Sequence, residues 1–197
     1  MAGRTALVLA GTGMVDPVVH ALTAQGWRVV LPSRRYNPIA LRPGERGTER
    51  HGRGGRRAVG REGPGVAVWV AAHWDRPREL AAAVDRVLDE PADLLVAWVH
   101  ESYRRSVLDV VEPLLASRAP VVEVRGGASP FGEPPEPVLA EHPTQLVLLG
   151  MVSERDSDRA LSHTEMVDGI LAAVRRAVDG RPPGVHQVGQ LRQTSGY

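Results

Sequence analysis

A short glycine-rich segment near the start of the chain has the residue types that bind phosphate through the backbone. Gly11, Thr12, Gly13 and Met14 follow an apolar run and precede a helical pattern. Glycines let the main chain approach a pyrophosphate, and the following helix N-terminus offers free amide donors. The pattern predicts a dinucleotide-binding turn; the alternative is a strand–helix turn that binds nothing. Asp16 stands where a small residue would help the helix pack, and its charge would repel a nearby phosphate.

The residues after the second apolar run indicate which nucleotide would bind. Ser33, Arg34 and Arg35 stand about twenty residues after the turn, where an NAD site usually has an acidic residue for the ribose hydroxyls. A guanidinium group instead forks onto a phosphate. We therefore expect NADP(H) as the cofactor, and the alternative is a pair of solvated arginines.

Candidate proton donors follow later apolar runs. Histidine gains and loses a proton near neutral pH, so His100 could protonate a nascent alkoxide or amine, and the phenol of Tyr103 could do the same. We predict both as catalytic residues, with Ser129 as a third. The alternative for each is a polar residue at a strand–helix junction. Glu101 and Glu123 are lesser candidates.

The composition excludes several kinds of chemistry. The 197 residues include no cysteine and no lysine, which rules out disulfides, thiolate zinc sites, Walker-type phosphate loops and Schiff bases. The seven histidines show no paired metal spacing, so we predict no metal. A net charge of +1 does not indicate a nucleic-acid partner. No apolar run is long enough for a membrane helix, and we expect a cytoplasmic protein acting on a small molecule.

These residues need strands and helices to position them, and the two kinds of hydrophobic pattern alternate along the chain. Continuous apolar runs predict strands at 4–10, 27–31, 66–72, 93–99, 120–124, 145–152 and 185–191. Helical stripes follow the glycine turn up to Gly26 and recur at 76–88, 102–117 and 163–178. This alternation predicts an α/β fold with a doubly wound, mainly parallel sheet of about seven strands, the Rossmann fold, with helices on both faces.

Local signals define several boundaries. Asp75 is a plausible N-cap for the helix at 76–88, and Pro113 should kink or end the next helix. The sequence Ser162-His163-Thr164-Glu165 is a capping box.

We expect a single domain over residues 1–191 and a tail at 192–197. The segment 41–65 contains eight glycines and seven arginines, which predicts a flexible loop. An arginine-rich arm for an acidic partner is the alternative.

Three blocks of the sequence resemble the short-chain dehydrogenase/reductase superfamily, in particular its small, atypical members. They are LVLAGTGMV…LTAQGWRVVLPSRR, the run Trp98-Val99-His100-Glu101-Ser102, and LLGMV followed by a capped helix and VHQVG. The resemblance implies a nicotinamide-dependent oxidoreductase, and a homodimer formed through the helices at 76–88 and 102–117.

The resemblance also implies roles for individual residues. Gly11, Thr12, Gly13 and Met14 would line the pyrophosphate, and Ser33, Arg34 and Arg35 would hold the adenosine phosphate. His73, Trp74 and Asp75 would lie near the adenine, and Val99 and His100 beside the nicotinamide ribose.

The chain departs from the family at its catalytic pair, a Tyr-x-x-x-Lys motif. Tyr36, Tyr103 and Tyr197 cannot form it because the chain has no lysine, and Ser129 stands near the position of the family's serine. The sequence therefore leaves two alternatives. One is an NADP(H)-dependent reductase of a small C=O, C=N or C=C substrate. The other is a redox-silent protein, such as a cyclase or an NADP-sensing regulator.

Overall fold

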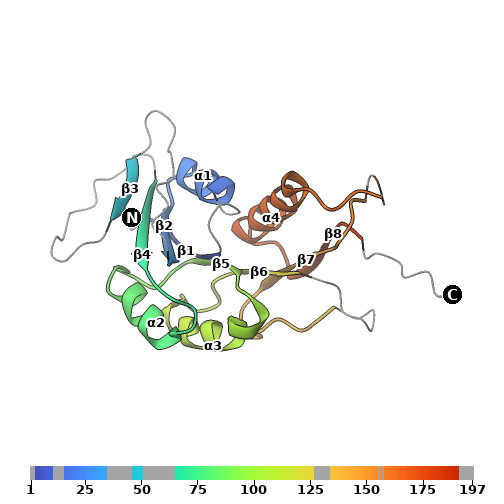
Figure 1. Cartoon of the computed structure of the whole chain (residues 1–197). Helices are drawn as coiled ribbons and strands as arrows, with labels where there is room; N and C mark the ends of the chain where they lie inside the picture. The colour runs from blue at the N-terminus through green and yellow to red at the C-terminus, as the bar shows by residue number, and fades with distance from the viewer. Residues whose placement is uncertain are drawn as a thin grey trace.

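The computed structural model describes residues 3–10, 16–34, 65–126, 134–154, 156 and 158–190, together with the backbone of 46–50. The strands are β1 (Thr5–Ala10), β2 (Arg28–Ser33), β3 (Arg46–Arg50), β4 (Val66–Ala71), β5 (Leu94–Trp98), β6 (Val121–Gly126), β7 (Thr144–Leu149) and β8 (Gly184–Val188) (Figure 1). The helices are α1 (Asp16–Ala24), α2 (Pro77–Asp85), α3 (Glu101–Val111) and α4 (His163–Val178), and a 3-10 turn at Glu112–Leu114 follows α3.

All these strands form one sheet in the order β3-β4-β2-β1-β5-β6-β7-β8, and every neighbouring pair is parallel. The chain moves from β1 to β2 and β4 on one side, and from β5 to β6, β7 and β8 on the other. The order therefore reverses between β1 and β5. The predicted doubly wound parallel fold is confirmed, with β3 as a strand beyond the seven predicted.

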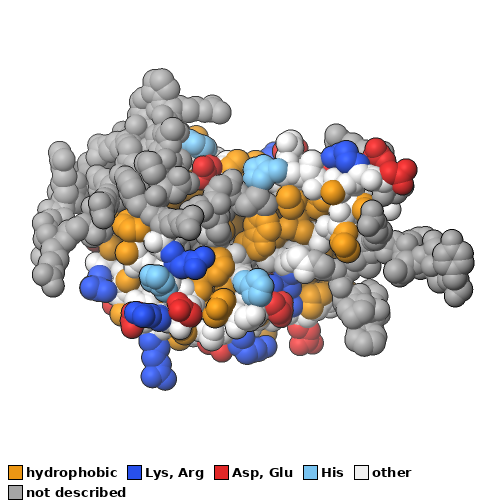
Figure 2. Space-filling model, in the orientation of Figure 1, with side chains coloured by type: hydrophobic (Ala, Val, Ile, Leu, Met, Phe, Trp, Pro, Cys, Tyr) orange, Lys and Arg blue, Asp and Glu red, His pale blue; other side chains and the backbone are white. Residues whose placement is uncertain are grey.

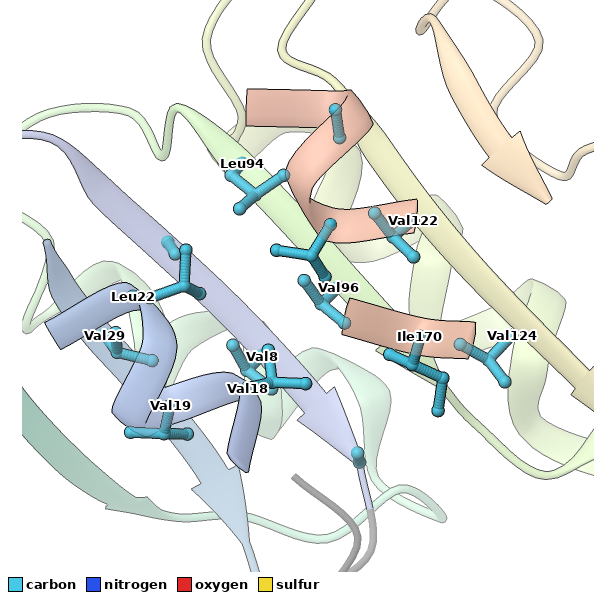
Figure 3. Packing of buried hydrophobic residues seen from close by; sticks show 14 of the residues in the cluster. Val8, Val18, Val19, Leu22, Val29, Leu94, Val96, Val122, Val124 and Ile170 are labelled. Carbon is cyan, nitrogen blue, oxygen red and sulfur yellow. The ribbon is translucent and has the colours of Figure 1, made fainter. Parts of the chain in front are cut away.

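Two layers of helices cover the sheet (Figure 1). α1 and α4 pack on one face, where Val18, Leu22 and Ile170 are fully or almost fully buried against strand residues such as Val8 and Val96 (Figure 3). α2 and α3 pack on the other face in a second cluster. All six residues of β1 are buried, which explains why its sequence is continuously apolar from Ala6 to Ala10. Each such buried aliphatic side chain contributes about 1.5–3 kcal/mol to stability.

The local signals for helix ends are confirmed at three places. The capping box of α4 is formed in both directions between Ser162 and Glu165. α3 ends at Val111, and the chain continues as the 3-10 turn that contains Pro113. Gly26 follows α1 with a φ of 82°, a conformation that glycine adopts without strain.

Asp75 is not the N-cap of α2, so that prediction is wrong. The cap is Arg76, and no side chain bonds to the free amides of the first turn. Pro77 is suited to the first helical position because its φ is already fixed there, and this makes the residue just before it the cap. The Asp75 carboxylate lies instead 3.9 Å from His73 Nδ1.

The segment 41–65 is not wholly a loop, because residues 46–50 form β3. This strand pairs with β4 at one edge of the sheet, with an irregular register between Arg46 and Glu49. The glycine-rich segment carries no apolar strand pattern, and the pairing is made through backbone groups. Gly65 is required where it stands, since a Cβ atom would lie 2.2 Å from the carbonyl oxygen of Trp27.

No helix in the described part of the chain is long and apolar enough to cross a membrane.

Candidate functional site

The parallel strands all end at one edge of the sheet, and the candidate site residues gather along it. Ala10, the last residue of β1, is in register with Trp98, the last residue of β5. The strand order reverses between these two strands, and doubly wound sheets bind ligands in the crevice at such a reversal. Trp98 is half-buried against the core on the α1 and α4 side. In Figure 2, hydrophobic side chains gather over α4.

At the end of β2, Ser33 belongs to the strand and Arg34 follows it, exposed. Ser33 Oγ accepts a hydrogen bond of 2.9 Å from the indole Nε1 of Trp69, on the adjacent β4. No acidic residue occurs among Leu31 to Arg34, as the sequence already indicated.

The end of β4 carries the residues expected near an adenine. His73 and Asp75 are exposed, and the distance of 3.9 Å between them allows only a weak ion pair when the histidine is protonated. Trp74 is partly buried and packs against the cluster under α2 and α3.

At the end of β5, His100 caps α3. Its Nδ1 accepts a hydrogen bond of 3.2 Å from the Ser102 backbone N–H, one of the free amides of the first helical turn. Because Nδ1 accepts, the neutral ring carries its proton on Nε2. Tyr103 follows in the same helix, with its ring centroid 6.4 Å from that of His100 and 39% of its surface exposed.

Val99 could face a ligand only with its backbone groups. Its side chain is 1% exposed and lies in the core with residues of α2 and α3. His100, the next residue and the N-cap of α3, is exposed.

Asp16 occupies the first turn of α1, directly after the glycine turn in sequence. Its Oδ1 is buried and has no hydrogen-bond partner among the described residues. A carboxylate is favoured electrostatically at a helix N-terminus, but a buried, unpartnered oxygen is costly.

From the sequence, Glu123 was only a lesser catalytic candidate. The structure places it in a buried charged cluster on β6 and α3. Glu123, 1% exposed, accepts hydrogen bonds from Arg125 Nε at 2.8 Å and from the Val138 backbone N–H at 3.0 Å. Arg104 reaches it from α3, with Nε 3.8 Å from Glu123 Oε1, and also bonds Glu101. The sequence signal for this cluster was Glu123, the single acidic residue inside the apolar run PVVEV.

These contacts join three segments: α3, β6 and the described part of the connection that follows β6. Arg104 ties the start of α3 to β6, and Arg125 Nη2 donates to the Glu136 carbonyl at 2.7 Å. Together with the Val138 bond, they hold the described end of the connection between β6 and β7, residues 134–143, which contains no helix.

The connection from β7 to α4 is fixed by Glu165. Its carboxylate accepts from Ser153 Oγ at 2.5 Å, from Ser162 Oγ at 2.6 Å and from Arg159 Nη2 at 3.0 Å. The hydrogen bonds from Ser153 and Ser162, with a smaller contribution from Arg159, lower the pKa of Glu165 to about 2. Backbone bonds between Val152 and Gln190 join the same connection to the end of β8.

Several predicted site residues lie outside the described ranges, namely Gly11, Thr12, Gly13, Met14, Arg35 and Ser129. The described residues contain no group of three or more side chains that could hold a metal ion.

Solved structures share this architecture over nearly the whole chain. The NADH-dependent reductase A1-R′ in complex with NAD matches with a TM-score of 0.55 and 13% identity, over 95% of each chain. A short-chain dehydrogenase from Mycobacterium thermoresistibile matches with a TM-score of 0.55 and 12% identity, over 94% of this chain and 84% of its own. The landomycin C-6 ketoreductase LanV, with bound NADP and rabelomycin, matches with a TM-score of 0.53 and 10% identity, over 97% and 96%.

The chain therefore shares the doubly wound fold of these solved reductases and dehydrogenases. No protein-family model matches its sequence, and no curated protein does. The resemblance stated from the sequence is thereby confirmed at the level of the fold.

The described residues agree with the binding of a nicotinamide dinucleotide in two respects and conflict with it in one. The strand order reverses between β1 and β5, the place at which doubly wound sheets bind dinucleotides. The end of β2 offers the Ser33 hydroxyl and the exposed Arg34. Asp16 conflicts, because a carboxylate in the first turn of α1 opposes a pyrophosphate bound there.

Proposed function

We propose that the chain is an NADP(H)-dependent oxidoreductase of the atypical short-chain dehydrogenase/reductase type, acting on a small substrate with a C=O, C=N or C=C bond. The observation that carries the proposal is the convergence of the end of β2, with Ser33 and Arg34, and the end of β5, with His100, on the edge where the strand order reverses. The similar folds that bind NAD or NADP support it.

The adenosine end of the cofactor would be held by side chains that suit a phosphate. Arg34 carries a full positive charge, Ser33 a hydroxyl, and the predicted third member is Arg35. With no carboxylate at the end of β2 to bind the ribose hydroxyls, the 2′-phosphate of NADP(H) is the better ligand.

The candidate donor to the substrate is His100. The bond from Ser102 N–H fixes Nδ1 as the acceptor, so the neutral ring presents Nε2–H as a hydrogen-bond donor. The bound dihydronicotinamide would supply the hydride. Nε2–H would then donate a hydrogen bond to the oxygen or nitrogen that gains negative charge, and the phenol of Tyr103, the second candidate, would supply the proton, with Ser129 as the third predicted residue.

Cofactor binding is the first experiment. Titration of the purified protein with NADPH, followed by calorimetry or tryptophan fluorescence, is expected to show saturable binding in the micromolar range. Absence of binding at millimolar NADPH would contradict the proposal. A Glu79→Gln variant, changed on the exposed surface of α2, is the matched control and should bind as the wild type does.

Turnover is tested separately, by following NADPH oxidation with a panel of ketones, imines and enones. Loss of one hydrogen-bond donor to the developing negative charge typically lowers kcat about 10²–10³-fold, so His100→Ala should lower kcat within that range while NADPH still binds at saturating concentration. Equal turnover by wild type and His100→Ala would remove His100 from the mechanism.

A second candidate function is supported by a specific observation, the missing lysine. Without a Tyr–Lys pair, and with no helix among residues 134–143, the fold could bind NADP(H) and carry out a non-redox step or sense the nucleotide. This candidate predicts tight NADPH binding with no oxidation by any carbonyl, imine or enone tested, and sustained oxidation would exclude it.

A further inference from the structure

A row of apolar side chains lies at the carboxyl edge of the sheet, on the side of α1 and α4. Trp98 ends β5, and Val96, two residues earlier on the same face, is a core residue under these helices. Trp98 packs against the same cluster but is only half-buried. Its side chain therefore lies between the core and the edge at which doubly wound sheets bind ligands.

Met166 of α4 reaches the same level of this edge as Trp98. Figure 3 shows Ile170 of α4 in one cluster with Val96 and Val124. Because α4 leads from the carboxyl end of β7 back to the start of the parallel strand β8, it runs opposite to the strands. The four residues from Ile170 back to Met166 rise about 6 Å, and the two residues from Val96 to Trp98 advance by about the same distance.

Met151 and Leu161 continue the row along the connection after β7. Leu161 precedes the capping residue Ser162, and Met166 is the fourth residue after it, positions at which two apolar side chains often pack together. The Leu161 N–H donates to the Met151 carbonyl at 3.1 Å, and the Met151 N–H donates to the Gln190 carbonyl at 2.9 Å. The backbone of Met151 is thus held on both sides, while the residue is 60% exposed. We call these four residues, Trp98, Met151, Leu161 and Met166, the apolar row.

The end of β6 leaves space on the same side of the sheet. Gly126 is the last residue of β6 and lies on the same face as Val124, two residues earlier. No atom of the described residues lies within 4 Å of the position that a Cβ atom would take at Gly126. In the connection to α4, the charges of Arg159 and Glu165 pair with each other at 3.0 Å. An uncharged apolar group therefore fits this side better than an ionic one.

The other side of the same edge is polar. His100 and Tyr103 belong to the start of α3, which covers the opposite face of the sheet, and Tyr103 is 39% exposed. A ligand at this edge would meet hydrogen-bond donors on one side and the apolar row on the other. Ligand sites commonly combine a mainly apolar lining with a few polar groups that fix the orientation.

We propose that the substrate is an uncharged ring compound whose reducible bond faces His100 and Tyr103 and whose apolar body packs against the apolar row. Both methionines of the described part of the chain belong to this row. Methionine suits such a ligand because its flexible thioether adapts to different shapes and makes favourable contacts with aromatic rings. The inference rests on the proposed function, since it names the class of substrate for that site.

The first experiment uses a binding probe and needs no turnover. N-phenyl-1-naphthylamine, an uncharged aromatic compound whose fluorescence rises in apolar surroundings, is titrated into the protein with and without NADP⁺. We expect saturable binding, which Met151→Gln and Met166→Gln should each weaken about three- to tenfold, because a polar amide replaces part of the apolar contact surface.

Val185→Thr is the matched control for the methionine variants. It changes another exposed hydrophobic side chain, on β8, to a polar one of the same shape and should leave probe binding unchanged. Because Met151 is exposed, Met151→Gln should fold as the wild type does, and it carries the test if Met166→Gln fails to fold.

The second experiment compares two ketones as substrates with NADPH. The carbonyl of 1-tetralone lies at the edge of a fused ring system, whereas dihydroxyacetone is small and polar. We expect kcat/KM to be at least about tenfold higher for 1-tetralone, the discrimination that apolar contacts supply, and Met151→Gln should reduce this preference. A preference for dihydroxyacetone would overturn the inference.

The remaining outcomes separate this inference from the proposed function. Equal probe binding by the wild type and both methionine variants, or no saturable binding by the wild type, would overturn the role of the apolar row. Absence of NADPH binding, together with probe binding that depends on Met151, would overturn the proposed function and leave the row as a binding surface for an uncharged ring compound.

Discussion

At the scale of single residues, Asp16 is the one described side chain that opposes the proposed cofactor. The sequence shows it where a small residue is usual, and the structure adds that its Oδ1 is buried without a partner among the described residues. An acidic residue in the first turn stabilises α1 by about 0.3–1 kcal/mol. The same charge weakens the attraction of this helix end for a pyrophosphate, so helix stability and phosphate binding conflict at this position.

Asp16→Asn should separate these two effects. Removal of one negative charge close to the pyrophosphate should tighten NADPH binding about three- to tenfold, because two charges about 4 Å apart in water interact by about 1 kcal/mol. The lost helix interaction should lower the free energy of unfolding by about 0.3–1 kcal/mol. Calorimetry with NADPH and urea denaturation measure the two changes.

Asp85→Asn, which changes an exposed residue of α2, is the control and should leave NADPH binding unchanged. Weaker NADPH binding by Asp16→Asn would contradict the prediction, because it would show that the carboxylate assists the ligand.

At the scale of elements, the connection between β7 and α4 depends on one ionised side chain. Hydrogen bonds from Ser153 and Ser162 lower the pKa of Glu165 to about 2, from an ordinary value of 4.5. A carboxyl with a lower pKa in the folded state stabilises the fold fully above its unfolded pKa. That contribution disappears as the pH falls from about 4.5 toward about 2.

Glu165→Gln should therefore remove a pH-dependent part of the stability. We expect wild type to be more stable than Glu165→Gln at neutral pH, with the difference shrinking steadily as the pH falls below about 4.5. Urea denaturation of both proteins across this range measures it. Glu90→Gln, on the exposed turn after α2, should show no such trend, and a constant difference for Glu165→Gln would contradict the assigned cause.

The buried cluster around Glu123 joins β6, α3 and residues 134–138, so its loss should affect all three. Glu123→Ala leaves the buried Arg104 and the partly buried Arg125 without their shared carboxylate, and such a change typically costs about 3–5 kcal/mol. Chemical denaturation measures the loss. The exposed pair of Arg76 and Glu79, at 3.5 Å, is the matched control, and Glu79→Ala should cost less than about 1 kcal/mol. A similar small effect of Glu123→Ala would mean that the cluster relaxes or takes up water.

Most elements were predictable because hydrophobic periodicity dictates them. The limits of α4 match the prediction of 163–178, where a capping box and a glycine mark both ends. β3 was missed because an edge strand paired through its backbone needs no apolar pattern. The cap of α2 was misplaced by one residue, because Pro77 rather than the acidic side chain sets the first turn.

The site was less predictable than the fold, and the reason is physical. Ser33, Arg34, His73 and His100 could be placed at one edge because parallel strands end together. The hydrogen bond from Trp69 to Ser33 joins two strands, and no local sequence pattern fixes the register between them. This bond therefore could not be predicted from the sequence. The same holds for Arg104 and Glu123, which come from a helix and a strand.

At the scale of the whole molecule, the homodimer expected from the resemblance stays a prediction, and the surface of α3 bears on it. The exposed residues of that helix include Ser102, Arg105, Ser106 and Asp109. Cores of protein interfaces are usually depleted of charge, so a contact through α3 would be a polar one. Among the described residues, β8 is an edge strand of the sheet, and its Val185 is 51% exposed.

The reversal of strand order between β1 and β5 also divides the polypeptide into two consecutive lengths. Residues up to Ala71 build the sheet on one side of the reversal, and residues from Leu94 build the other side. A break in the exposed turn after α2, near Asp89, would leave two fragments that meet along β1 and β5. A dinucleotide that binds at this reversal, as we propose, would contact both fragments, so reassembly of the two fragments would report its binding.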